Sequence, residues 1–166
     1  MHGLLLLTAL ALSHGTTASL RDVAPAGAPR TACELLSTAE VAAFLRVPAV
    51  QIDSLNSGMN ELTKVDFCSW FVHPGESQGV MLKLRRAASP DEVPPAFIAA
   101  KVDEEMSPPA EPASIPGVGE EALYLPYADG TGGTIVVRQR ASVVTLIGSA
   151  SKETLASMAR KVLPRL

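Results

Sequence analysis

The residues most suggestive of chemistry lie around the stretch 64–72, where a cysteine and a serine come shortly before a histidine. Ser69 or Cys68 paired with His73 would supply a nucleophile and a base. The stretch has the composition of a β-strand, however, and Ser69 and His73 would then lie about 13 Å apart on one face, at about 3.3 Å per residue. Cys68 would point to the opposite face. We therefore expect His73 to be a surface residue at the end of a strand, and a hydrolase is the least favoured hypothesis.

Metal ligands are too few to predict a metal centre. A zinc site needs three or four ligands, usually His or Cys. After the first 18 residues the chain offers His73, Cys33 and Cys68, and the two cysteines are expected to be bonded to each other. No Asp-rich calcium loop is present. We expect neither a metal nor a cofactor.

Two short motifs resemble functional loops but are incomplete. Gly117-Val118-Gly119 lacks the third glycine of a phosphate-binding loop, and Glu120 and Glu121 would repel phosphate. It predicts a tight turn in which the glycines adopt positive φ. The Ser149–Lys152 stretch matches Ser-x-x-Lys, but the Lys-Thr-Gly and Ser-Asp-Asn motifs of penicillin-binding enzymes are absent. We expect Ser151 to cap a helix instead.

Composition narrows the classes of partner. The formal net charge is −3 and the sequence pI is about 5.6, so no basic surface for nucleic acid is indicated. Aromatic residues make up 4% of the chain, which argues against base-stacking platforms. We expect no nucleic-acid partner. A length of 166 residues favours one domain.

The beginning of the chain has the pattern of a secretory signal peptide. A short apolar run over 4–12 is followed by small residues, and cleavage is expected after Ala18, with Gly15 as the alternative. Residues 1–18 would be the signal peptide, residues 19–31 a flexible tether and residues 32–166 a single domain. No second apolar run follows, so the mature chain is predicted to contain no membrane span. The protein is expected to be exported, as a periplasmic or secreted protein.

An even pair of cysteines in an exported chain favours a disulfide. A bond between Cys33 and Cys68 would stabilise the fold by roughly 3–4 kcal/mol in the chain-entropy model. Two buried free thiols are the alternative. Trp70 would share a strand face with Cys68, so we expect it in the core beside the disulfide. The alternative is that Trp70 is an exposed aromatic that binds a partner.

The first helix has a clear beginning. Ser37 and Glu40 fit a capping box, in which each side chain accepts the amide of the other residue. Leu36 and Val41 occupy the positions of a hydrophobic staple, and Pro48 follows the helix.

The remaining pattern predicts an α+β fold. Strands are expected at 50–55, 65–72, 80–85, 121–125, 134–139 and 143–147, with a helix at 95–106, a surface loop at 107–114 and a last helix from Ser151. We expect 65–72 to be the central strand. The order α-βββ-α-βββ-α predicts an antiparallel sheet with the helices on one face.

The chain also resembles a group of small exported bacterial domains of unknown function, many of them actinobacterial lipoproteins. The resemblance covers about residues 32–166. It rests on 32–41 (ACELLSTAEV), 68–70 (CSW) and 117–124 (GVGEEALY), followed by a strand pair and a closing amphipathic helix. It implies export, a disulfide and an α+β sheet, and it supplies no catalytic residues. The chain departs from the lipoproteins because no cysteine follows the leader directly.

Three functions remain in competition. The first is a non-catalytic extracytoplasmic module that binds an envelope protein or another envelope component. The second is a carrier that holds a small apolar ligand between the sheet and its helices. The third is an enzyme, which the absence of a catalytic set disfavours.

Overall fold

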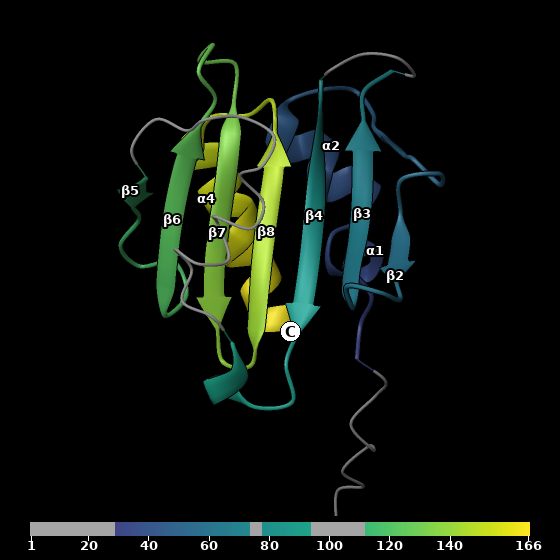
Figure 1. Ribbon diagram of the computed structural model, residues 1–166. Coiled ribbons are helices and arrows are strands. Elements are labelled where there is room, and N and C mark those ends of the chain that lie inside the picture. The colour runs from purple at the N-terminus through teal and green to yellow at the C-terminus, as the bar shows by residue number, and fades with distance from the viewer. Residues whose placement is uncertain (1–28, 74–77, 94–111) are drawn as a thin grey trace, which may run out of the picture.

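The computed structural model describes residues 29–73, 78–93 and 112–166. Within these residues one antiparallel sheet forms the body of the domain, in the order β1-β3-β4-β8-β7-β6-β5, with β2 also paired to β3 (Figure 1). The strands are β1 (Gln51–Ile52), β2 (Gly58–Asn60), β3 (Val65–Phe71), β4 (Gly79–Arg86), β5 (Ala113–Ser114), β6 (Glu121–Pro126), β7 (Gly133–Gln139) and β8 (Ser142–Gly148).

The described helices lie on one face of this sheet. They are α1 (Ala32–Leu35), α2 (Thr38–Leu45) and α4 (Lys152–Val162), and Figure 1 shows all of them behind the strands. Short 3-10 helices follow at Pro90–Glu92 and Leu163–Arg165. The predicted α+β class with an antiparallel sheet is confirmed. The predicted helix at 95–106 lies outside the described residues.

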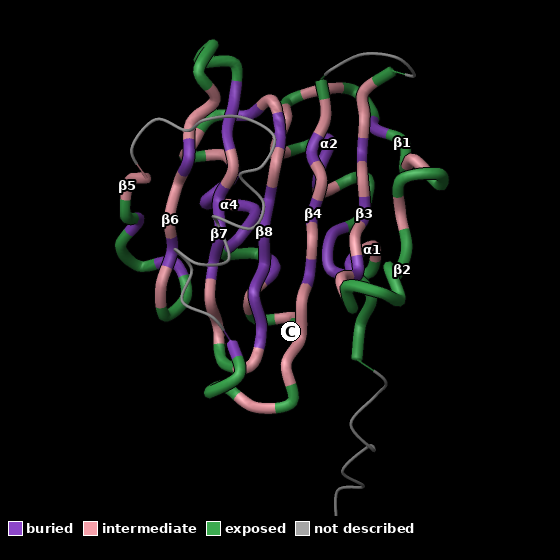
Figure 2. The backbone as a smooth tube through the Cα atoms, in the orientation of Figure 1, coloured by how far each residue is buried: buried purple, intermediate pink, exposed green. Residues whose placement is uncertain are grey.

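The main core fills the space between the sheet and the helices. Strand β3 alternates intermediate and buried residues, and its buried positions Asp66, Cys68 and Trp70 face the helices. The predicted inward residues Val80, Leu82 and Leu84 of β4 are at most 2% exposed. Figure 2 shows this burial running through β4, β8 and β7. The core therefore follows the period-2 pattern of the strands.

The middle of the sheet differs from the prediction. Strand β3 lies next to the edge that β1 and β2 form, and β8 takes the central position. Strand β8 is buried on both faces, with five consecutive buried residues from Ser142 to Leu146. A strand that is buried on both faces reads as a continuous apolar run, whereas β3 alternates.

The predicted helix starts are confirmed. Ser37 caps α2 and accepts the Glu40 amide at 3.2 Å, while the Glu40 carboxylate accepts the Ser37 amide at 3.0 Å. Leu36 and Val41 are both fully buried, as a hydrophobic staple requires. Ser151 caps α4 by accepting the Thr154 amide at 3.2 Å.

Two strand boundaries are corrected. The strand predicted at 50–55 ends at Ile52, because the Asp53 carboxylate accepts the amides of Leu55 and Asn56 and folds the chain into a turn. The loop predicted at 107–114 contains β5 at its end, where Ala113 and Ser114 pair with β6. The rest of that predicted loop, through residue 111, lies outside the described residues.

Helix α1 was not predicted, and it depends on contacts with β3. Its four residues are joined to the sheet by the Cys33–Cys68 disulfide, with the two Cα atoms 5.0 Å apart. The Asp66 carboxylate accepts the Ala32 amide at 2.7 Å. The predicted disulfide is confirmed, and the alternative of two free thiols is wrong. In the described part of the chain, no helix is long and apolar enough to cross a membrane.

Candidate functional site

The structure does not assemble the catalytic pairs that the sequence suggests. Cys68 is bonded to Cys33, so it has no free thiol. His73 is exposed just beyond the end of β3. Ser69 points to the face of the sheet opposite α1, α2 and α4, because it alternates with Cys68 along the strand. The described residues therefore give no support to a hydrolase built on these side chains.

A hollow of about 910 Å³ lies elsewhere, on the face of the sheet opposite the described helices. It is formed where β3, β4 and β8 meet at the upper end of the sheet in Figure 1. The β1–β2 connection borders it on one side and the β6–β7 turn on the other. Its described lining residues are Asp53, Asn56, Ser69, Trp70, Phe71, Gln78, Gly79, Val80, Met81, Tyr127, Asp129, Thr131, Ile147, Gly148 and Ser149.

The register of the strands determines which side chains form the floor of this hollow. Ser69 pairs with Met81, and Met81 pairs with Ile147, so the three side chains form one row across β3, β4 and β8. Phe71 lies two residues beyond Ser69 on the same face. Gly79 and Gly148 border the hollow without a side chain. The result is a mainly apolar floor with one hydroxyl at its β3 end.

The Ser69 hydroxyl is the unusual polar group of the floor. Its oxygen is buried and has no hydrogen-bond partner among the described residues. The main chain of the same residue is fully used, because its amide donates to Ser57 Oγ at 3.0 Å and its carbonyl accepts the Asp53 amide at 2.9 Å. A buried hydroxyl without a partner costs free energy, and such groups occur where a ligand or water completes the bond.

Two carboxylates stand at the rim, each within a turn. Asp53 accepts the Asn56 side-chain amide at 2.7 Å, and this bond, helped by the Leu55 and Asn56 amides, lowers the pKa of Asp53. Asp129 accepts the amide of Thr131 at 3.0 Å and its hydroxyl at 2.8 Å, which lower the pKa of Asp129. Both are ionised at neutral pH. Among the described lining residues none is Lys, Arg or His, so the lining carries negative charge.

Tyr127 connects the Asp129 side of the rim to the sheet. Its amide donates to the Gly132 carbonyl at 3.0 Å, which closes the β6–β7 turn. Burial raises the pKa of Tyr127 above its ordinary value, so the phenol stays protonated at neutral pH and can donate a hydrogen bond. The rim therefore offers an aromatic ring beside a carboxylate.

Comparison with known proteins identifies no relative. No protein-family model, curated protein or solved structure matches this chain. Any function must therefore be argued from the residues themselves.

Trp70 belongs to the core. It is 1% exposed and faces the helices, so its ring is not available to a ligand on the surface. The interpretation of Trp70 as an exposed binding aromatic is therefore wrong. Sequence reasoning missed Met81 and Ile147 as floor residues because their types are ordinary for a sheet. The alternating pattern of β4, with Met81 between the inward residues Val80 and Leu82, marks that side chain as outward-facing.

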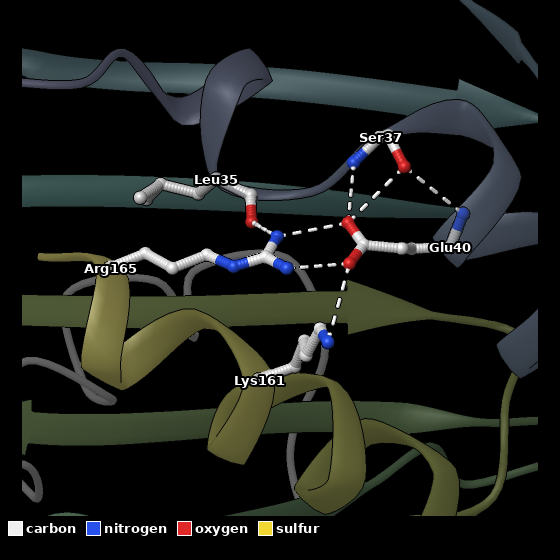
Figure 3. A network of polar contacts seen from close by, with 5 residues as sticks. All are labelled: Leu35, Ser37, Glu40, Lys161 and Arg165. Carbon is white, nitrogen blue, oxygen red and sulfur yellow. Dashed lines mark hydrogen bonds and ion pairs between the residues drawn. The ribbon is translucent and has the colours of Figure 1, made fainter.

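A network of polar contacts joins α2 to the residues that follow α4, and its role is structural. Arg165, near the end of the chain, donates to Glu40 at 2.9 and 2.5 Å and to the Leu35 carbonyl at 2.7 Å (Figure 3). Lys161 lies 3.5 Å from the same carboxylate. Hydrogen bonds from Arg165 hold the pKa of Glu40 well below its ordinary value. Both carboxylate oxygens of Glu40 are therefore occupied, and they join α2 to the residues after α4. We call this set of contacts the Glu40 clamp.

The two short motifs are structural as well. Gly117 and Gly119 have φ of +72° and +61°, which confirms the predicted tight turn. Ser151 caps α4, so Ser149 and Lys152 flank a helix start. Within the described ranges, no three side chains of the His, Cys, Asp or Glu type gather as a metal site.

The space between the sheet and the helices is filled. Its largest side chains, including Trp70, Leu35, Leu82 and Met158, are at most 1% exposed. The hollow lies on the opposite face of the sheet, away from the position that the carrier hypothesis assigns to a ligand.

Proposed function

We propose that this domain is a non-catalytic binding module that takes a small ligand in the hollow on the face of the sheet opposite the described helices. The observation that carries the proposal is the buried Ser69 hydroxyl, unpartnered on an otherwise apolar floor. A few polar groups on a mainly apolar surface are typical of small-molecule sites. The volume of about 910 Å³ is within the range of such sites.

The lining suggests the chemistry of the ligand. The apolar part of a ligand would lie on Phe71, Met81 and Ile147. A hydrogen-bond acceptor on the same ligand would accept a hydrogen bond from the Ser69 hydroxyl. At the rim, the ionised Asp129 and the ring of Tyr127 favour a positively charged group. We infer that the hollow prefers an organic cation to a neutral or anionic compound of the same shape.

The proposal places the module outside the cytoplasm. The expected leader over residues 1–18 supports export, and the Cys33–Cys68 disulfide is compatible with an oxidising compartment. The resemblance to exported domains of unknown function agrees with this placement. Intact-mass measurement of the protein recovered from outside the cytoplasm tests it, and a chain that still begins at residue 1 would contradict it.

A matched series of probes tests the binding site. Phenethylamine, phenethyl alcohol and phenylacetate share a phenyl body and differ in the charge of the head group. Titrated into the protein and followed by amide NMR, the amine should bind roughly three- to tenfold more tightly than the alcohol at low ionic strength, and the acid most weakly. The shifted amides should belong to Ser69, Met81, Ile147 and the turn of Tyr127.

Asp129→Asn is the informative variant, because an asparagine oxygen can still accept the Thr131 amide and keep the turn. It should remove the preference for the amine and leave the alcohol unchanged. Asp91→Asn, on an exposed 3-10 helix outside the hollow, is the matched control and should behave like the unsubstituted protein. Shifts scattered over the surface, or equal affinity for all three probes, would contradict the proposal.

A further inference from the structure

Two carboxylates border the hollow from opposite sides. Asp53 follows β1, and its amide donates to the Ser69 carbonyl at 2.9 Å, so it stands beside β3. Asp129 belongs to the turn between β6 and β7, where the Gly130 amide donates to the Tyr127 carbonyl at 3.0 Å. Strands β3, β4 and β8 lie between these two positions in the sheet. The hollow therefore has one acid on each of two opposite sides.

The floor side chains form a row that leads from one acid towards the other. The antiparallel pairing of β1 with β3 continues beyond β1 and places Asp53 opposite Ser69. Ser69 pairs with Met81 of β4, and Met81 pairs with Ile147 of β8. Ile147 in turn pairs with Thr134 of β7. Because paired residues share one face of a sheet, a ligand that lies along this row crosses the strands and runs from Asp53 towards the β6–β7 turn.

The separation of the two acids sets the length of such a ligand. From β1 to β7 the sheet has four interstrand spacings, so these two backbones lie about 19 Å apart at about 4.8 Å per spacing. The side chain of an aspartate and its hydrogen bond to a ligand cover only part of this distance at each end. A ligand that contacts both acids is therefore long and carries a polar group at each end.

Both acids favour a cation as that polar group. Hydrogen bonds within their own turns lower the pKa of Asp53 and Asp129, so both are ionised at neutral pH. Asp129 accepts two hydrogen bonds from Thr131, and Asp53 accepts three from Leu55 and Asn56. An ionised carboxylate has about four acceptor positions, so these contacts still allow each acid to accept an N–H from an ammonium group.

We propose that the hollow binds a long linear diamine, with one ammonium group at Asp53, the other at Asp129 and the apolar chain along the floor. This inference rests on the proposed function, because it names the class of ligand for the same site. The Tyr127 ring adds a cation–π contact on the Asp129 side. The Ser69 hydroxyl stands next to Asp53 in the row, so a hydrogen-bond acceptor on the chain near that ammonium group would accept its proton.

The geometry separates a diamine from other cations. A single ammonium group neutralises one acid and leaves the other without a cation. A short diamine carries both charges but does not reach across the floor. A divalent metal ion needs oxygen ligands at about 2.3–2.6 Å from one point, whereas these two acids are placed on opposite sides of three strands.

Paired probes of increasing length test the inference. Each alkylene diamine is compared with the alkylamine of the same chain, in the butyl, octyl and dodecyl series, by titration followed by amide NMR. These compounds lack an acceptor on the chain, so they isolate the contribution of the second charge. The second ammonium group should add little in the butyl pair. In the octyl or dodecyl pair it should tighten binding about three- to tenfold at low ionic strength, and salt should reduce this gain.

Two variants assign the charges. Asp53→Asn and Asp129→Asn should each remove the gain of the long diamine, because an asparagine oxygen keeps the turn but carries no charge. Asp53→Asn should leave the preference for phenethylamine unchanged, since that preference is assigned to Asp129. Asp91→Asn, outside the hollow, is the matched control and should keep the full gain. Unchanged affinity of octylamine for each variant shows that the floor is intact.

The outcomes separate this inference from the proposed function. A diamine that gains nothing over its monoamine at any length, or a gain that survives Asp53→Asn, would overturn the diamine and leave the preference for phenethylamine standing. Failure of phenethylamine and of every alkylamine to bind would overturn both. A gain that appears only with long chains and disappears with either acid supports the bridging ligand.

Discussion

Asp66 is a buried side chain that stabilises helix α1, a helix too short to be stable by itself. Helix α1 has four residues, and an isolated helix of that length is unstable because nucleation is unfavourable. Asp66 is 5% exposed and accepts the amide of Ala32, the first helical residue. The next helical residue, Cys33, is bonded two positions further along β3. Two adjacent links therefore hold α1 on the sheet.

Replacing Asp66 by alanine should destabilise the protein by about 1–3 kcal/mol, because the buried Ala32 amide would lose its acceptor. Asp66→Asn keeps an acceptor oxygen and should cost less. Urea unfolding at neutral pH measures both. Asp91→Ala, at an exposed position, should remain within about 0.5 kcal/mol of the unsubstituted protein. Equal stability of the Asp66 and Asp91 alanine variants would show that the bond to α1 contributes nothing.

This residue also marks a limit of sequence interpretation. The pairing of Cys33 with Cys68 can be predicted, because two cysteines in an exported chain leave one intramolecular combination. The role of Asp66 cannot be predicted, because its partner is a main-chain amide 34 residues away. Nearly every residue has such an amide, so the sequence does not mark the partner. Long-range contacts to the main chain leave no pattern of residue types.

At the scale of elements, the Glu40 clamp joins the beginning and the end of the domain. Glu40 stands in the first turn of α2, where an acid is favoured by the helix dipole, and it also belongs to the capping box. Arg165 reaches it from the 3-10 helix that follows α4 (Figure 3). One carboxylate thus caps α2 and ties it to the closing helix.

The clamp should make stability depend on pH in a defined direction. The pKa of Glu40 in the folded protein lies below the ordinary value of 4.5, so the folded state binds the proton less readily than the unfolded chain. Its stabilisation is complete above about pH 5.5 and declines as pH falls through 4.5 towards the lower folded pKa. Glu40→Gln should therefore lower the melting temperature at pH 7, and the difference should shrink at pH 3.

Calorimetry at both pH values checks this prediction. Glu153→Gln, in the first turn of α4, is the matched control, since Glu153 is also an acid near a helix start but lies outside the clamp. A difference between Glu40→Gln and the unsubstituted protein that stays constant from pH 7 to pH 3 would rule out the carboxylate as the source of the pH dependence.

Elements with strong local patterns could be predicted, and those set by distant contacts could not. The strands β3 and β4 and the helix α4 repeat their side-chain period for several residues, and β7 and β8 contain runs rich in β-branched residues, so their positions are clear from the sequence. Strands β2 and β5 contain three and two residues and exist because a longer neighbour pairs with them. The order of the strands in the sheet cannot be predicted from the sequence either, and β8 rather than β3 lies at the centre.

For the whole molecule, the two faces of the sheet have different roles. The helix-covered face holds the main core. The other face carries the hollow, together with a smaller buried cluster over β6, β7 and β8 that includes Leu125, Val136 and Val143. The hollow could not be predicted, because its lining comes from strand ends and turns that the sequence keeps far apart. Among the described lining residues, the sequence singles out Ser69, Trp70 and Ser149, and each of them for a reason unrelated to the hollow.

Hydrogen exchange should report the position of each strand in the sheet. Amides of β4 and β8 should exchange most slowly, because these strands lie inside the sheet and their opening requires the whole sheet to separate. Amides of residues 58–60 should exchange faster, since β2 is short and lies at an edge of the sheet. Strand β5, with two residues at the opposite edge, is the internal comparison and should also exchange fast. Exchange at β2 or β5 that is as slow as exchange at β4 and β8 would contradict this order of strands.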